Sequence, residues 1–386
     1  MMSKITPYSR HSIFKKDFQI VKKSLRSDYL TNGDYLKYFE EKFRKFVGSK
    51  YSVACSNGTA GIYIAYKSLN LKKGSVVIIP AINFLAAFNM ANFLDCKIFI
   101  ADVDENSGQM TPHGLLKCIK KNKLKKIDLV VTMYNGGCPL HAKEFFKLKK
   151  RYKFKILEDA CHALGANYIN TKNKIGSCKF SDICVFSFHP QKTITTGEGG
   201  MITTNSKKYL KQMLIFRNHG IERKKNTKIK FNWKYVVKDP SFNFRLSELN
   251  CALGFTQLDK IPLFVKKRRE IAKIYNKIFE NNKCIRILPQ KHFKLSNAWH
   301  LYFIQINKTS KIDRDTLMQK LYKRGILTQV HYIPIFLQPK YFKLKKQDKF
   351  VGAMNFFKDT VSIPIYPKLS LKKVKNIGEI INKLTN

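Results

Sequence analysis

The sequence predicts an α/β protein whose large lobe holds a mostly parallel seven-stranded sheet and whose smaller C-terminal lobe is α+β. Three observations carry this prediction. The chain has 386 residues, more than a single hydrophobic core usually serves. Short β-branched and apolar runs alternate with amphipathic patterns, as buried parallel strands alternate with helices. A long helical pattern at 245–282 then separates these runs from a second set of strands and helices.

The strands of the large lobe are expected at seven runs such as "VVIIP" and "KILED". These runs are 51–55, 76–80, 97–101, 128–133, 155–159, 183–188 and 200–204. Ligands of such sheets bind where parallel strands end at their carboxyl side. The functional residues are therefore sought just after these runs.

The helical pattern at 245–282 is expected to bridge the two lobes, with Pro262 as a break or kink. We place the large domain at 1–255 and the small domain at 256–386. In the small domain we expect a helix near 313–324, a terminal helix from about Ser370, and strands at 298–306, 326–332 and 361–365.

The charge of the chain raises the question of a nucleic-acid partner. Lys and Arg number 73 against 26 Asp and Glu, a formal charge of +47. The lysines are spread over every segment, which favours a solvated surface that steers anions over a dedicated nucleic-acid stripe. The stretch 224–238 interleaves basic and aromatic residues, and it could meet either nucleic acid or an anionic small substrate. We expect no nucleic acid, and a basic nucleic-acid-binding protein remains the rival from another class.

The cysteines and the apolar runs indicate a cytoplasmic protein without a metal or a membrane span. The nine cysteines form no C-x-x-C pair, which argues against zinc and against a disulfide framework. The start, "MMSKITPYSRHS", lacks the apolar core of a signal peptide. The apolar stretch 75–94 is interrupted by Pro80 and three asparagines, so we expect a strand, a turn and a helix there.

Three motifs suggest chemistry. In "SNGTAG", Gly58 and Thr59 would open a helix, whose first N–H groups can cradle a phosphate, although an ordinary turn and cap explains the motif equally well. In "LEDACHALGA", Asp159 ends a strand and His162 follows, and a buried carboxylate there needs a positive partner. The alternative is a helix cap with a satisfied histidine.

The third motif is "FSFHPQKTITTGEGG", in which Lys192 lies between a strand and a glycine-rich turn. A lysine screened from water has a depressed pKa, so its amine can form a Schiff base with a carbonyl. A surface lysine is the alternative for this motif alone. In this order, the phosphate cradle, Asp159 and Lys192 are the parts that hold pyridoxal 5′-phosphate: phosphate anchor, pyridinium partner and aldehyde partner.

With these residues the chain resembles the DegT/DnrJ/EryC1/StrS sugar aminotransferases, which are pyridoxal phosphate enzymes of fold type I. The resemblance covers nearly the whole chain, including "FNFRLSELNCALG" and "KRGILTQVHYIPI". It implies that Lys192, Asp159 and His162 are catalytic and that Lys192 carries the cofactor as a Schiff base. The further cofactor contacts that it implies are Gly58, Thr59, Phe84 on the ring face, Ser187, and Asn243 of a neighbouring subunit. The substrate contacts that it implies are Arg245, His331, Tyr332 and Tyr134.

The resemblance also implies a homodimer with shared active sites and amino transfer from L-glutamate, with release of 2-oxoglutarate. The subgroup most like this chain belongs to the pseudaminic acid route and acts at C4 of a UDP-linked 4-keto-6-deoxy-N-acetylhexosamine. Relatives acting on GDP- or dTDP-linked 4-keto or 3-keto sugars remain alternatives. The dehydratases of the family replace the lysine by histidine, so Lys192 argues against that activity. Two departures, Asn83 before the stacking aromatic and "YNGGCP" at 134–139, concern the substrate-facing wall.

Overall fold

The computed structural model describes residues 5–223, 234–287 and 296–386. Its large lobe is built on a seven-stranded sheet of order β1-β7-β6-β5-β4-β2-β3, in which only β7 runs antiparallel to its neighbours. The strands are β1 Tyr51–Cys55, β2 Val76–Pro80, β3 Lys97–Ala101, β4 Leu129–Met133, β5 Lys155–Asp159, β6 Ile183–Ser187 and β7 Gly200–Thr204. All seven expected strands are therefore present, and a mostly parallel sheet in an α/β lobe is confirmed.

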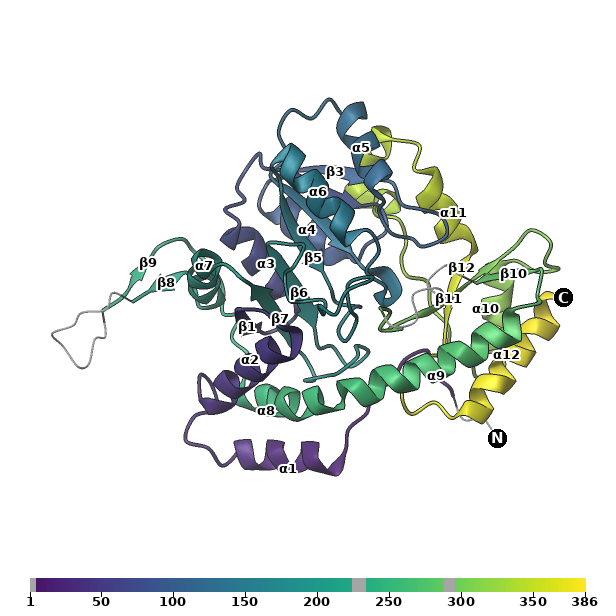
Figure 1. Cartoon of the computed structure of the whole chain (residues 1–386), viewed down its shortest axis with the longest axis horizontal. Coiled ribbons are helices and arrows are strands. Elements are labelled where there is room, and N and C mark those ends of the chain that lie inside the picture. The colour runs from purple at the N-terminus through teal and green to yellow at the C-terminus, as the bar shows by residue number, and fades with distance from the viewer. Residues whose placement is uncertain (1–4, 224–233, 288–295) are drawn as a thin grey trace.

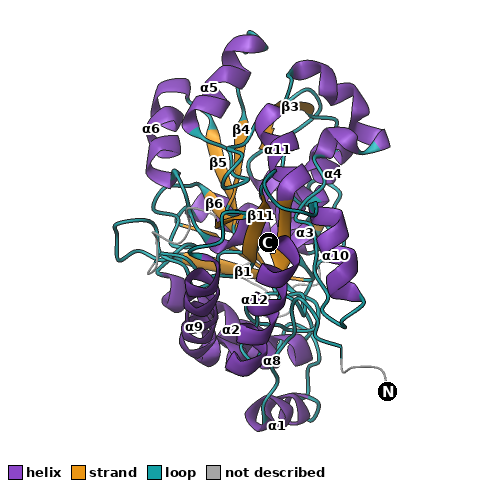
Figure 2. Ribbon diagram, turned by 90° about the vertical axis from the view of Figure 1, so that its right-hand side faces the viewer, coloured by secondary structure: helices purple, strands orange, loops and turns teal. Residues whose placement is uncertain are grey.

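Helices cover both faces of this sheet. Successive side chains of a strand point to opposite faces, and the side chains on both faces are apolar. In β6, Val185 packs with one core cluster, which includes α3 and α4, while Phe186 packs with another, which includes α2 and α8. Figure 2 shows α5 and α6 on one side of the strands and α3 and α4 on the other. The helices of this lobe are α1 Lys15–Ser24, α2 Asp34–Val47, α3 Gly58–Ser68, α4 Leu85–Phe93, α5 Pro112–Lys121, α6 Ala142–Tyr152, α7 Lys207–Arg217 and α8 Glu248–Gln257, with the short turn η1 Asn135–Gly137.

The long helix α9, Ile261–Phe279, leads from the large lobe to the small one along the lower edge of the molecule in Figure 1. It follows α8 through the turn η2 Leu258–Lys260. Pro262 lies in the first turn of α9, where no intrahelical N–H is needed. The predicted break therefore falls at the start of the helix and does not kink it.

The small lobe is a three-stranded antiparallel sheet, β10-β11-β12, packed against α9, α10 and α12. Its elements are β10 Ile285–Ile287, β11 Tyr302–Ile306, α10 Arg314–Tyr322, η4 Ile335–Leu337, η5 Pro339–Gln347, α11 Val351–Asp359, β12 Thr360–Ile363 and α12 Leu371–Thr385. The prediction of a strand at 326–332 is wrong. That segment pairs only at single bridges, Ile326 with Thr6 and Gln329 with Ser362. A two-stranded hairpin, β8 Ile221–Glu222 and β9 Val236–Val237, projects from the large lobe beside α7 (Figure 1).

One edge of the large sheet is closed by a side chain. The carboxamide of Gln347, at the end of η5, accepts a hydrogen bond from the Ile100 amide at 2.8 Å and donates to the Ile98 carbonyl at 2.9 Å. The outer strand β3 is therefore bonded along this stretch as if a further strand lay beside it.

The apolar stretch 75–94 forms strand β2 and helix α4, joined by a turn, inside the large lobe. Among the described residues, no helix has both the length and the apolar character needed to cross a membrane.

Candidate active site

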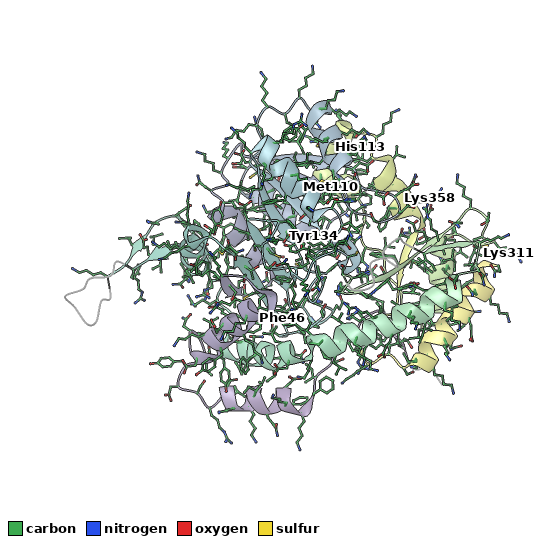
Figure 3. All side chains as sticks on the ribbon, in the orientation of Figure 1. Phe46, Met110, His113, Tyr134, Lys311 and Lys358 are labelled. Carbon is green, nitrogen blue, oxygen red and sulfur yellow. The ribbon has the colours of Figure 1, made fainter. Side chains whose placement is uncertain are left out.

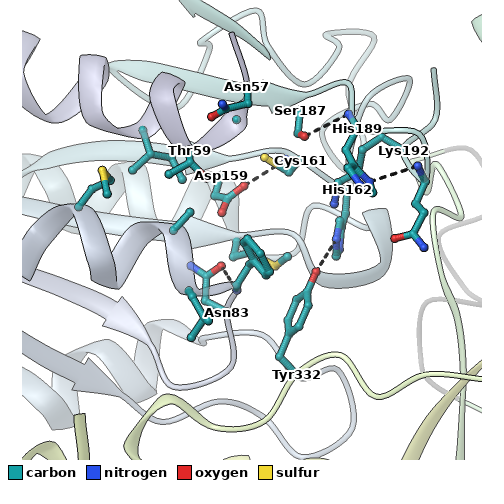
Figure 4. Close-up of a pocket in the computed structure, with 18 of the residues that line it drawn as sticks. Asn57, Thr59, Asn83, Asp159, Cys161, His162, Ser187, His189, Lys192 and Tyr332 are labelled. Atoms are coloured by element: carbon teal, nitrogen blue, oxygen red, sulfur yellow. Dashed lines mark hydrogen bonds between the residues drawn. The ribbon is translucent and has the colours of Figure 1, made fainter. Parts of the chain in front are cut away.

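A cavity of about 940 Å³ opens where the parallel strands of the large lobe end (Figure 4). Strands β1, β2, β4, β5 and β6 all run in one direction, so the residues that follow them meet at this edge of the sheet. Nine residues singled out in the sequence line this cavity: Gly58, Thr59, Phe84, Asp159, His162, Ser187, Lys192, His331 and Tyr332.

The N-terminus of α3 forms one wall of the cavity. Asn57 caps the helix, and its Oδ1 accepts a hydrogen bond from the Ala60 amide at 2.8 Å. The amides of Gly58 and Thr59, the first two of the helix, have no acceptor in the described part of the chain, so they are available to an anion. A Cβ on Gly58 would come within 2.9 Å of the Ser187 Cβ, so glycine permits the close approach of helix and strand here.

Asp159 is buried and Lys192 is partly buried around the same cavity. The Asp159 carboxylate accepts a hydrogen bond from the Cys161 amide at 3.2 Å. Burial raises the pKa of Asp159, although Cys161 and Lys192 partly counter this. Burial lowers the pKa of the Lys192 amine, against the opposing effect of Cys161 and Asp159. A lowered pKa favours the neutral amine, which is the form that acts as a base or nucleophile.

His162 lies among other rings at the wall opposite α3. Its Nε2 is 2.9 Å from the Tyr332 hydroxyl, as Figure 4 shows, and its Nδ1 accepts from the Gly136 amide at 3.4 Å. The ring centroid of His300 is 4.3 Å away. Burial lowers the pKa of His162 well below its usual value, and the positive charge of Lys192 adds to this effect. Both effects favour the neutral imidazole.

Tyr134 does not face the cavity, which corrects the prediction that it contacts the substrate. Met133 pairs with Asp159 across β4 and β5 and lines the cavity, so the next side chain points to the opposite face. Tyr134 lies in the interior of the large lobe (Figure 3), and its hydroxyl donates to Glu158 Oε1 at 2.5 Å.

Asn243 and Arg245 lie outside the cavity of their own chain. Asn243 is exposed, and its Oδ1 accepts from the Arg245 amide at 3.2 Å. The guanidinium of Arg245 donates to Asn218. The predicted contacts of both residues involve a second subunit, so they stay predictions. Of the basic and aromatic stretch 224–238, residues 224–233 lie outside the described residues.

The sequence reasoning missed several residues of the cavity wall. Tyr8 reaches it from the N-terminal segment, and its hydroxyl donates to Gln191 at 2.6 Å. Asn83 and His300 line it while almost wholly buried. Asn83 was noted as a departure before the aromatic Phe84, which was a usable signal. His300 lies just before strand β11, and nothing in that run marks it as functional.

The cavity wall fits pyridoxal phosphate. Within the described residues, Asn83 Nδ2 and His300 Nδ1 are buried atoms without a hydrogen-bond partner. Two helix amides are available to an anion, and a buried carboxylate and a partly buried amine line the same cavity. This set matches a phosphate, a ring N–H⁺, an aldehyde and further polar atoms of one bound group. Among the described residues, no group of His, Cys, Asp or Glu could hold a metal ion.

Comparison with known proteins finds relatives over nearly the whole chain. A model of the DegT/DnrJ/EryC1/StrS aminotransferase family matches residues 11–382. A UDP-4-amino-4,6-dideoxy-N-acetyl-beta-L-altrosamine transaminase of Campylobacter jejuni is 32% identical over 97% of this chain and 96% of its own. Helicobacter pylori PseC, an aminotransferase of pseudaminic acid biosynthesis, is 30% identical with a TM-score of 0.90 over 99% of each chain. The PLP-form of Spr1654 from Streptococcus pneumoniae, 24% identical, shares the fold with a TM-score of 0.87 over 98% of each chain.

Proposed function

The chain belongs to the DegT/DnrJ/EryC1/StrS aminotransferase family, and from this premise we propose its substrates and the roles of its residues. The proposed reaction moves the amino group of L-glutamate to C4 of a UDP-linked 4-keto-6-deoxy-N-acetylhexosamine. The keto oxygen of the sugar leaves as water, and a water molecule supplies the oxo oxygen of the 2-oxoglutarate that is released. The observation that carries this proposal is the meeting of Lys192, Asp159 and the α3 N-terminus in one cavity.

The residues present would hold pyridoxal phosphate by three contacts. The Gly58 and Thr59 amides with the Ser187 hydroxyl would bind the phosphate, Asp159 the ring nitrogen, and Lys192 the aldehyde carbon covalently. When bound, this cofactor supplies an electron-withdrawing ring that stabilises negative charge on the amine-bearing carbon. The buried Asp159 carboxylate suits a cationic ring nitrogen, because such a partner offsets the cost of its burial.

Lys192 would move the proton. Burial lowers the pKa of its amine and so favours the neutral form, in which Nζ can take a proton from the amine-bearing carbon of glutamate. In the second half-reaction, the ammonium form would deliver a proton to C4 of the sugar. The buried His162 and the partly buried Tyr332 on the opposite wall would exclude water from C4.

The nucleotide sugar is proposed from the relatives. Two proteins at 30–32% identity over nearly full length are named for altrosamine-type amino sugars or for pseudaminic acid biosynthesis. The cavity of about 940 Å³ has the size of drug-sized ligand sites, which suits a sugar beside the cofactor. His331 and Tyr332 line the cavity and would lie near this sugar.

We propose a homodimer with shared sites because of the aromatic side chains at the mouth of the cavity. Four aromatic rings that line the cavity pack on one another there, with centroids 5.4–6.0 Å apart and ring planes inclined by 53–66°: Tyr63, Phe93, Phe242 and Phe244. Phe93 and Phe242 are each about half exposed on an otherwise lysine-rich surface. Exposed aromatic clusters of this kind are typical of interfaces. A second copy seated here would bring its own Asn243 and Arg245 towards the cavity.

The test is an assay of the purified chain with pyridoxal phosphate, L-glutamate and a panel of UDP-, GDP- and dTDP-linked keto sugars. Release of 2-oxoglutarate and the position of the new amine, read by NMR, identify the substrate. Borohydride reduction and peptide mass mapping should find the cofactor on Lys192. Lys192→Ala should lose both signals, whereas Lys208→Ala, at an exposed site on α7, should keep them. Cofactor on Lys192 without turnover of any keto sugar would contradict the proposed substrate class.

A further inference from the structure

The turn that follows strand β4 makes three successive contacts with the site. Tyr134 anchors it to Glu158, and Asn135 Nδ2 donates to the His331 carbonyl at 3.2 Å. The Gly136 amide donates to His162 Nδ1 at 3.4 Å. The turn therefore holds both His162 and the segment that carries Tyr332.

Glycines are needed for this placement. Gly136 has φ of 78° and Gly137 of 102°, values that favour glycine. A Cβ on Gly136 would come within 2.7 Å of the Phe303 ring, and one on Gly137 within 2.6 Å of the His162 carbonyl oxygen. Because these two residues have no side chains, the backbone of the turn packs directly against the backbone of His162.

The contact from Gly136 decides which ring nitrogen of His162 carries the proton. A backbone amide can only donate, so Nδ1 must be the acceptor and must lack a proton. In a neutral imidazole the proton then lies on Nε2. The groups facing this ring, Lys192, His300 and His331, include no carboxylate that would favour the doubly protonated form.

The Tyr332 hydroxyl consequently accepts from His162 and keeps its own hydrogen for another partner. No other hydrogen-bond partner of this hydroxyl is found in the described ranges 5–223, 234–287 and 296–386. Tyr332 lines the cavity, and its ring centroid is 5.7 Å from that of Phe84.

We propose that the Gly136 amide holds His162 as the tautomer protonated on Nε2, so that the Tyr332 hydroxyl donates its hydrogen to an oxygen of the group bound in the cavity. Gly136 and Asn135 are then positioning residues, and Tyr332 is a donor for a carbonyl, carboxylate or phenolate oxygen. The inference concerns hydrogen bonds of the chain itself, so it can fail or hold independently of the sugar that is accepted.

The experiment is solid-state ¹⁵N NMR on the cofactor-supplemented full chain labelled with ring-[¹⁵N]histidine. The His162 signals are assigned as those that a His162→Asn variant lacks. The wild type should show a protonated Nε2 and an unprotonated Nδ1. Tyr332→Phe should keep this state, because Gly136 and not Tyr332 sets it. Gly136→Ala should move part or all of the proton to Nδ1.

Gly74→Ala is the matched control, since Gly74 has φ of 83° but nothing lies within 4 Å of its added Cβ. This variant should leave the His162 signals unchanged. A proton on Nδ1 of the wild type would overturn the proposal, as would a change of tautomer in Tyr332→Phe. Those two measurements decide the question even if Gly136→Ala fails to fold.

Discussion

Glu158 and Asp159 are neighbours at the end of β5 whose side chains lie on opposite faces of the sheet. Exchanging each carboxylate for its amide should therefore separate folding from catalysis. Glu158→Gln should lower stability, because three hydroxyl groups converge on this carboxylate. They belong to Tyr134 at 2.5 Å, Tyr168 at 2.8 and 2.9 Å, and Ser181 at 2.9 Å.

The magnitude follows from these contacts. In either orientation the amide places its NH₂ group against the hydroxyl of Tyr134 or of Ser181. A buried hydroxyl without its acceptor costs about 1–3 kcal/mol. Burial raises the pKa of Glu158 as it does that of Asp159, so no charge-assisted share is added for the remaining bonds. We expect Glu158→Gln to lose about 1–3 kcal/mol of the free energy of unfolding and a few degrees of Tm.

Asp159→Asn should behave in the opposite way. Its acceptor role towards the Cys161 amide survives in asparagine. Burial raises the pKa of Asp159, so the ionised form costs stability, and the amide removes that cost. Its Tm without cofactor should equal or exceed that of the wild type, while transamination should fall by at least about 100-fold because the ring nitrogen loses its anionic partner.

The assay compares thermal unfolding of the cofactor-free chains with turnover at saturating cofactor. Tyr168→Phe is an intermediate control, since it removes one of the three hydroxyls and leaves the cavity wall intact. An unchanged Tm for Glu158→Gln would refute the reasoning. So would an Asp159→Asn variant that unfolds as early as Glu158→Gln.

Three further results are expected. Gly58→Ala should weaken cofactor binding about tenfold in equilibrium dialysis, because the new Cβ meets Ser187 and displaces the helix amides; unchanged affinity would contradict the phosphate role. Burial raises the pKa of Asp17, but its hydrogen bonds, above all the one from Lys260, outweigh this effect and lower the pKa. The stability that this carboxylate contributes is therefore present above pH 3.8, its ordinary pKa, and is lost as the pH falls below that value. Acid unfolding curves of Asp17→Asn should not show this loss. Phe242→Ser should shift the chain towards monomer in analytical ultracentrifugation and reduce activity in proportion, and a fully active monomer would exclude shared sites.

The large sheet could be predicted from the sequence because its strands are buried on both faces. Such strands appear as continuous apolar runs between turns, and this signal is local. The segment 326–332 looked similar, but it pairs through single residues only, and its side chains serve the cavity instead of a sheet. Strand β10, Ile285–Ile287, is too short for a pattern to reveal.

The site was predictable where a motif ties function to local backbone. Gly58 at a helix start and Asp159 at a strand end are such cases. Tyr134 was misplaced because one residue along a strand decides which face a side chain takes. His300 and Tyr8 could not be found, since they reach the cavity from the small lobe and from the N-terminal segment. Only the packing of distant segments brings them there.

The carboxamide of Gln347 has a consequence for self-association. By occupying the Ile98 carbonyl and the Ile100 amide, it removes two of the polar groups on β3 to which another molecule could add a strand. This border of the sheet is therefore a poor place for a second copy to extend the sheet. The aromatic side chains that line the cavity, Phe93 and Phe242 among them, offer an apolar surface for a pair of chains instead.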